Sequence, residues 1–174
     1  MLKLLLISVP FLFCLGSVFH FVYELSGKNK IIGLLVPVNE SIFEHSKLLF
    51  VPLVLFWLVA YFFIKDNIDA NKYFTSMLIS VIFSILVMIC FYYTYKEIIG
   101  NSYLWVDIFD LLLSLFIGQI FANHFYEYGM GIPVFISIGI TFIIFATYAY
   151  LTFNPFKTPF FYDEKNKVYG INKK

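Results

Sequence analysis

Long apolar segments separated by short polar connectors make up most of the chain. Five such segments lie at about residues 3–25, 42–64, 73–95, 104–126 and 132–153. A helix needs about 20 residues to cross the roughly 30 Å hydrocarbon core of a bilayer. The pattern therefore predicts an all-α, polytopic membrane protein, a bundle of five transmembrane helices.

The connectors are too short to hold a soluble domain. We expect a transmembrane bundle over residues 1–153 and a polar cytoplasmic tail over residues 154–174. No small-residue cleavage site follows the first apolar segment, so this segment is expected to stay as a spanning helix. Prolines at 10 and 52 fall inside predicted helices and should kink them, whereas those at 37 and 133 suit helix starts.

The composition agrees with a membrane protein and disfavours nucleic acid as a partner. Hydrophobic residues make up 61% of the chain and charged residues only 13%. All twelve basic residues are lysine, so the planar guanidinium that binds phosphate in a bidentate way is missing. Cys14 and Cys90 lie within apolar segments and are interpreted as small hydrophobic residues.

The lysines predict the orientation. Cytoplasmic ends of membrane helices carry an excess of lysine and arginine. One end of the predicted bundle has three lysines, namely Lys3, Lys65 and Lys72. The other end has nine, namely Lys28, Lys30, Lys47, Lys96, Lys157, Lys165, Lys167, Lys173 and Lys174. We therefore expect a multi-pass protein of the cell membrane with its N-terminus outside and its C-terminus in the cytoplasm.

The most polar stretch of the chain, Pro37 to Lys47, joins the first two apolar segments. In a helix starting near Asn39, Glu40 and Glu44 would share one face, and their repulsion would need a proton, a cation or Lys47 to offset it. Ser41-x-x-Glu44 also fits a capping box, in which Glu44 only satisfies backbone amides.

Other polar residues should meet this stretch at the same end of the bundle. His20 and Glu24 are four residues apart near the end of the first helix, and Asp107 and Asp110 open the fourth. Histidine and carboxylate ligands suit zinc, iron or manganese. The expected metal ligands are His20, Glu40, His45, Asp107 and Asp110. The expected catalytic residues are Glu24, which would orient His20, and Glu44, which would cap its helix or act as general base. Snorkelling near a helix end is the alternative for His20 and Glu24.

The fourth helix carries two polar stripes. Asp107, Asp110, Ser114 and Gly118 form a narrow stripe that we expect to face protein, because charge is costly in lipid. A second stripe on the opposite face is expected to make hydrogen bonds between helices. It consists of Gln119, Asn123 and Glu127.

Two motifs resemble a known family. His-Phe-x-Tyr-Glu at residues 20–24 and Pro-Val-Asn-Glu-Ser-x-x-Glu-His-x-Lys at residues 37–47 are similar to a family of small multi-pass bacterial membrane proteins whose function is not established. The resemblance implies a bundle of about five membrane helices, and it supplies no catalytic residues.

Three functions remain open from the sequence. The first is a metal-dependent hydrolase or transferase acting on a lipid or another amphiphile at the inner membrane face. The second is a transporter of protons, metal ions or a small solute, in which the same residues form a relay. The third is a non-catalytic assembly partner, in which the polar cluster only holds helices together.

Overall fold

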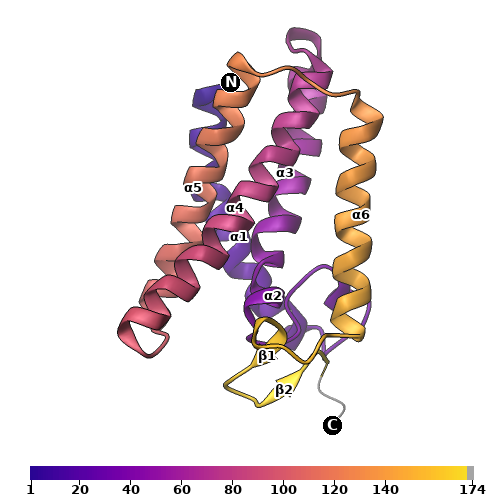
Figure 1. The fold of residues 1–174 in the computed structure, drawn as a ribbon. Coiled ribbons are helices and arrows are strands. Elements are labelled where there is room, and N and C mark those ends of the chain that lie inside the picture. Colours follow the sequence, from indigo (N-terminus) through magenta and orange to yellow (C-terminus); the bar gives the residue numbers. More distant parts are fainter. Residues whose placement is uncertain (172–174) are drawn as a thin grey trace.

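Five long helices form the bundle in the computed structural model, which describes residues 1–171 (Figure 1). They are α1 (Leu2–Leu25), α3 (Lys47–Ile64), α4 (Ala70–Ile99), α5 (Leu104–Tyr128) and α6 (Val134–Phe153). Within the described residues, five helical segments are long and apolar enough to cross a membrane. The predicted all-α fold of five spanning helices is confirmed.

Short elements occupy the ends of the bundle. A 3-10 turn, η1 (Ile32–Leu34), and the four-residue helix α2 (Ile42–His45) lie between α1 and α3, and a second turn, η2 (Lys65–Asn67), follows α3. The expected helix start near Asn39 is wrong, because the chain is extended at Ser41 and the Ser41 side chain caps α2. Pro37 therefore precedes α2 without starting a helix, whereas Pro133 directly precedes α6.

Local chemistry explains where the longest helix begins and ends. The Asp69 side chain accepts a hydrogen bond from the Lys72 amide at 3.0 Å and so caps the start of α4. At its end, Gly100 adopts a left-handed conformation with φ of 84°, which glycine permits without strain. The chain can therefore turn back at once into α5, and α4 and α5 pack against each other along much of their length.

Buried polar side chains link the helices inside the bundle. Gln119 of α5 is fully buried. Its side-chain amide donates to the Ser8 hydroxyl of α1 at 2.8 Å and accepts from the Ser80 hydroxyl of α4 at 3.1 Å. Gln119 thus makes the interhelical hydrogen bonds that its stripe predicted, and it ties three helices together.

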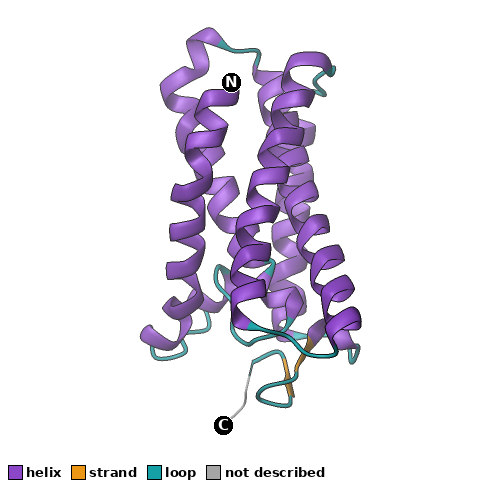
Figure 2. Cartoon of the chain, turned by 90° about the vertical axis from the view of Figure 1, so that its left-hand side faces the viewer, coloured by secondary structure: helices purple, strands orange, loops and turns teal. Residues whose placement is uncertain are grey.

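The C-terminal segment folds against one end of the bundle. It forms a 3-10 turn, η3 (Pro159–Phe161), which packs against α2. A two-stranded hairpin of β1 (Tyr162–Asp163) and β2 (Val168–Tyr169) follows and lies at the end of the bundle (Figures 1 and 2). Phe161 is buried, and its ring lies 4.5 Å from that of Phe43. These aromatic contacts hold the C-terminal segment, for which the sequence predicts a polar tail, against α2. Lys173 and Lys174, which entered the lysine comparison, lie outside the described residues.

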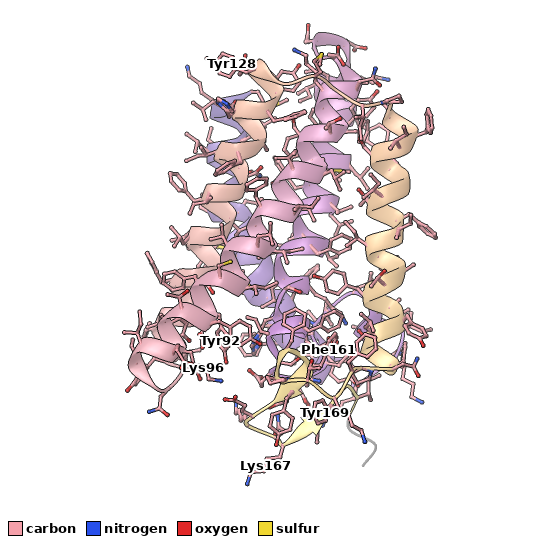
Figure 3. The ribbon with its side chains drawn as sticks, in the orientation of Figure 1. Tyr92, Lys96, Tyr128, Phe161, Lys167 and Tyr169 are labelled. Carbon is pink, nitrogen blue, oxygen red and sulfur yellow. The ribbon has the colours of Figure 1, made fainter. Side chains whose placement is uncertain are left out.

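The hairpin marks the end of the bundle where the polar residues gather. Tyr92, Lys96 and Phe161 lie at this end, and Tyr128 lies at the opposite one (Figure 3). Lys96, close to the end of α4, makes an ion pair of 2.6 Å with Glu164 of the hairpin turn. The C-terminal segment therefore contacts α2 through η3 and α4 through the hairpin turn.

Candidate metal centre

The segment between η1 and α3 turns sharply before the short helix α2. The Asn39 side chain accepts a hydrogen bond from the Ser41 amide at 2.9 Å, which is an Asx turn. The Ser41 hydroxyl then accepts from the Glu44 amide at 3.3 Å. These two side-chain bonds place Glu40 just before the helix and His45 on its last turn, and both meet His20 near the end of α1.

The three side chains form a compact group. The Nε2 atoms of His20 and His45 are 3.2 Å apart, and Oε2 of Glu40 lies 3.6 Å from the first and 3.5 Å from the second. All the potential ligand atoms lie within 4.8 Å of one another. About one third of the His20 and Glu40 side chains and 24% of His45 remain exposed. The group is therefore partly accessible from outside the protein.

These spacings fit a tetrahedral metal. Zinc bonds of about 2.0–2.1 Å at tetrahedral angles separate neighbouring ligand atoms by about 3.3–3.4 Å. The same bond lengths at octahedral angles would separate them by only about 2.8–3.0 Å. The observed separations of 3.2, 3.5 and 3.6 Å lie on the tetrahedral side. His20, Glu40 and His45 could therefore hold a metal ion with little rearrangement.

The charge of the Glu40 carboxylate also suits a cation. The contacts with His20 and, to a smaller extent, with His45 hold the pKa of Glu40 far below its ordinary value, and they outweigh the opposing effect of burial. Glu40 is thus an anion at neutral pH. An anionic oxygen next to two imidazole nitrogens is a ligand set that zinc accepts.

Glu44, predicted as a catalytic residue, belongs to a different network. It is buried and makes an ion pair of 2.7 Å with Lys47, which is also buried. The Lys47 ammonium also donates to the Gly33 carbonyl at 2.8 Å and to the Thr152 hydroxyl at 2.6 Å. Glu44 in turn accepts from the Val38 amide at 3.1 Å. Glu40 and Glu44 therefore face different partners, and Lys47 neutralises the second of them.

The two aspartates of α5 lie outside the His–Glu–His group. Asp110 is 2% exposed and accepts a hydrogen bond from Ser114 at 3.0 Å, so it faces protein as expected. Asp107 accepts a hydrogen bond from the Tyr95 hydroxyl of α4. Asp107 is nevertheless within electrostatic range of His45 and Glu40. Asp107 thus has its partner on α4 and Asp110 has its partner within α5, so the structure does not bring them into the ligand group.

Glu24, expected to orient His20, points elsewhere. Its side chain is 70% exposed and lies 3.5 Å from the Lys28 ammonium. The structure thus gathers His20, Glu40 and His45 out of the seven residues expected to meet, and each of the other four has a different partner.

Sequence reasoning missed a residue that contacts this group from the C-terminal hairpin. Asp163 is fully buried and accepts a hydrogen bond from the Glu40 amide at 3.0 Å. The turn-forming run of residues 163–166 between aromatic residues is typical of a hairpin and could have predicted the fold there. Nothing in it could have predicted a contact with a residue 123 positions earlier.

The fold and this group define a multi-pass membrane protein with a His–Glu–His triad that could bind a metal ion. The model of a family of unknown function, DUF6512, matches residues 1–171, and the chain belongs to that family. The family match covers far more of the chain than the two motifs on which the resemblance rested. No curated protein and no solved structure matches the chain.

Proposed function

We propose that the protein is a membrane-embedded, zinc-dependent hydrolase or transferase that acts on a lipid-like substrate. The observation that carries this proposal is the near-tetrahedral spacing of His20, Glu40 and His45. Catalytic zinc sites have three protein ligands and leave the fourth position to water or substrate, whereas structural zinc sites are closed by four. The partial exposure of these three side chains supports the catalytic type.

A bound zinc ion would polarise a water molecule or a substrate oxygen at its fourth position. A nearby base would then take a proton from the water. We assign this role to Asp107, whose carboxylate interacts electrostatically with His45 and Glu40 and accepts a hydrogen bond from the Tyr95 hydroxyl. Glu44 suits it less well, since Lys47 and Thr152 already occupy both of its oxygens.

Exposed apolar side chains at the triad's end of the bundle support an amphiphilic substrate. Phe21 is 62% exposed, and its ring lies 5.2 Å from that of His20. Trp105, two residues before Asp107, is 80% exposed, and tryptophan is enriched where membrane helices meet the headgroup layer. A substrate could keep its acyl chain in the bilayer beside these residues while its polar group reached the metal.

The proposal is tested by metal analysis followed by an assay. The full chain would be purified in detergent, stripped with a chelator, dialysed against zinc, iron and manganese in turn, and analysed for bound metal. We expect about one zinc per chain. The stripped and zinc-loaded forms would then be compared for hydrolysis of ester and phosphoester lipids in mixed micelles, and activity should require zinc. A chain that binds none of the three metals under these conditions would refute the proposal.

The short distance between the two histidines favours one alternative, proton transfer. Two imidazole nitrogens 3.2 Å apart can share a proton, and histidine often serves as a proton shuttle. In that case the triad would be the inner end of a proton relay. Proton flux into liposomes that persists without metal, and is lost on substitution of His45, would support this alternative over the enzyme.

A further inference from the structure

We propose that Asp163 is a positioning residue for the metal ligand Glu40, which makes the C-terminal hairpin part of the metal centre. This inference rests on the proposed function, because it concerns the same three ligands. The sequence of this C-terminal segment by itself predicts only a polar tail.

Glu40 depends on contacts from outside its own segment. It precedes α2, so no helical hydrogen bonds fix its backbone. Its amide instead donates to Oδ2 of Asp163 at 3.0 Å. The neighbouring Asn39 side chain donates to the Gly170 carbonyl at 2.9 Å. Two consecutive residues of the ligand segment are therefore bonded to the hairpin.

The Asp163 carboxylate is itself held firmly. Its Oδ1 accepts from the Asn166 amide at 2.8 Å, and its Oδ2 accepts from the Asn166 side chain at 2.9 Å. Asp163 is fully buried and pairs with Val168 across the hairpin. A carboxylate with its oxygens fixed in this way is a rigid acceptor, so it sets where the Glu40 backbone lies.

Loss of Asp163 should weaken metal binding through Glu40. Residues that orient metal ligands typically contribute 10–100-fold to metal affinity. We expect Asp163→Ala to weaken zinc affinity by a factor in this range. Asp163→Asn should weaken zinc affinity less than Asp163→Ala does, because its one remaining oxygen can still accept a hydrogen bond. Some loss is still expected, since the new amide N–H group would face an N–H donor.

Glu164→Gln is the matched control. Glu164 is next to Asp163, is 57% exposed and pairs with Lys96 at the surface of the same hairpin. It makes no hydrogen bond with Asn39 or Glu40 among the described residues. We expect its zinc affinity to stay within about twofold of the wild type, since exposed ion pairs contribute little.

The experiment measures zinc affinity by competition with a chromogenic chelator, using the full chain in detergent. Wild type, both Asp163 variants, Glu164→Gln, Glu40→Ala and the double variant Asp163→Ala/Glu40→Ala would be compared. If Asp163 acts through Glu40, adding Asp163→Ala to the Glu40→Ala variant should cause little further loss of zinc affinity. The absorption spectrum of the cobalt-substituted protein should also shift in Asp163→Ala, because a loosened carboxylate ligand changes the coordination.

The outcomes separate this inference from the proposed function. A wild type that binds zinc, together with an Asp163→Ala variant of equal affinity and unchanged cobalt spectrum, overturns the positioning role and leaves the zinc site standing. The positioning role is also overturned if Asp163→Ala lowers zinc affinity by the same factor in the wild type and in the Glu40→Ala variant. Asp163 would then act on the fold in general and not through Glu40. A wild type that binds no metal overturns both.

Discussion

The Nε2 atoms of His20 and His45 lie 3.2 Å apart, although one residue is near the end of α1 and the other ends α2. One cation could bind both nitrogens together with the Glu40 carboxylate. We therefore predict that replacing His45 or Glu40 by alanine lowers bound zinc by at least tenfold at micromolar free metal, with little loss of folded protein. Elemental analysis of the purified variants checks this.

Glu24 provides the control for this prediction. It is close to His20 in sequence, yet its exposed carboxylate faces Lys28. Glu24→Ala should therefore keep the wild-type zinc content. If Glu24→Ala lost zinc as His45→Ala does, the ligand assignment drawn from the geometry would be incorrect, and Glu24 would act as the sequence predicted.

The buried ion pair between Glu44 and Lys47 should be a main determinant of stability at this end of the bundle. Removing one partner leaves an unpaired charge at a buried site, which typically lowers the free energy of unfolding by about 3–5 kcal/mol. We expect Lys47→Met to lower the free energy of unfolding by an amount in this range. The double variant Glu44→Gln/Lys47→Met should recover part of the loss, because no unpaired charge remains. Denaturant unfolding in mixed micelles measures both.

The exposed pair of Glu24 and Lys28 is the matched comparison. It is also formed by residues close in sequence, but both side chains are more than half exposed. Lys28→Met should thus have a much smaller effect than Lys47→Met. Equal effects of the two substitutions would show that burial does not set the strength of these pairs.

The sequence predicted the helices well because apolar length is a strong signal in a membrane protein. A run of about 20 apolar residues has few alternatives to a spanning helix, since every backbone group must be satisfied in lipid. The predicted segment 104–126, for example, corresponds to α5 at Leu104–Tyr128. Local caps then extend or shorten such helices by a few residues.

The ligand group was harder to predict, because helical spacing says which residues share a face but not which neighbour they meet. Glu40 and Glu44 were placed on one face of one helix, but the cap at Ser41 leaves Glu40 outside α2. Lys47 then pairs with Glu44 alone. The contact of Asp163 with Glu40 depends on a chain reversal after α6, which no periodic pattern encodes.

Gly118 is predicted to be essential for the packing of α5 on α4. A Cβ atom there would lie 1.9 Å from the Ser84 hydroxyl and 2.8 Å from the Ser80 carbonyl, so the helices would have to separate. We expect Gly118→Ala to destabilise the protein by about 1–3 kcal/mol, the usual range for overpacking. Gly139→Ala in α6 is the control, because a Cβ there meets nothing within 4 Å. Thermal unfolding in detergent should show a lower midpoint for the first variant, and an unchanged or slightly higher one for the second.

The lysine excess predicts that the hairpin end of the bundle faces the cytoplasm, and the structure changes the number of lysines that count toward this excess. Lys47 is buried in its ion pair, so it cannot act as a free surface charge. Without Lys47, and counting only the residues that the structure describes, the hairpin end has six lysines against three at the other end. The excess still favours a cytoplasmic hairpin and metal centre, with the N-terminus outside.

Reporter fusions test this orientation directly. Green fluorescent protein fused to the C-terminus should fluoresce, and alkaline phosphatase at the same place should be inactive, because each reporter works on only one side of a bacterial cell membrane. Replacing Lys28 and Lys30 by asparagine should reduce the fraction of correctly oriented chains, since both lie in the connector next to α1 and topology follows lysines close to membrane helices. Replacing Lys47 should not shift this fraction through surface charge. An active phosphatase and a dark fluorescent protein would place the hairpin and the triad outside the cell, and the substrate would then have to be sought in the outer leaflet.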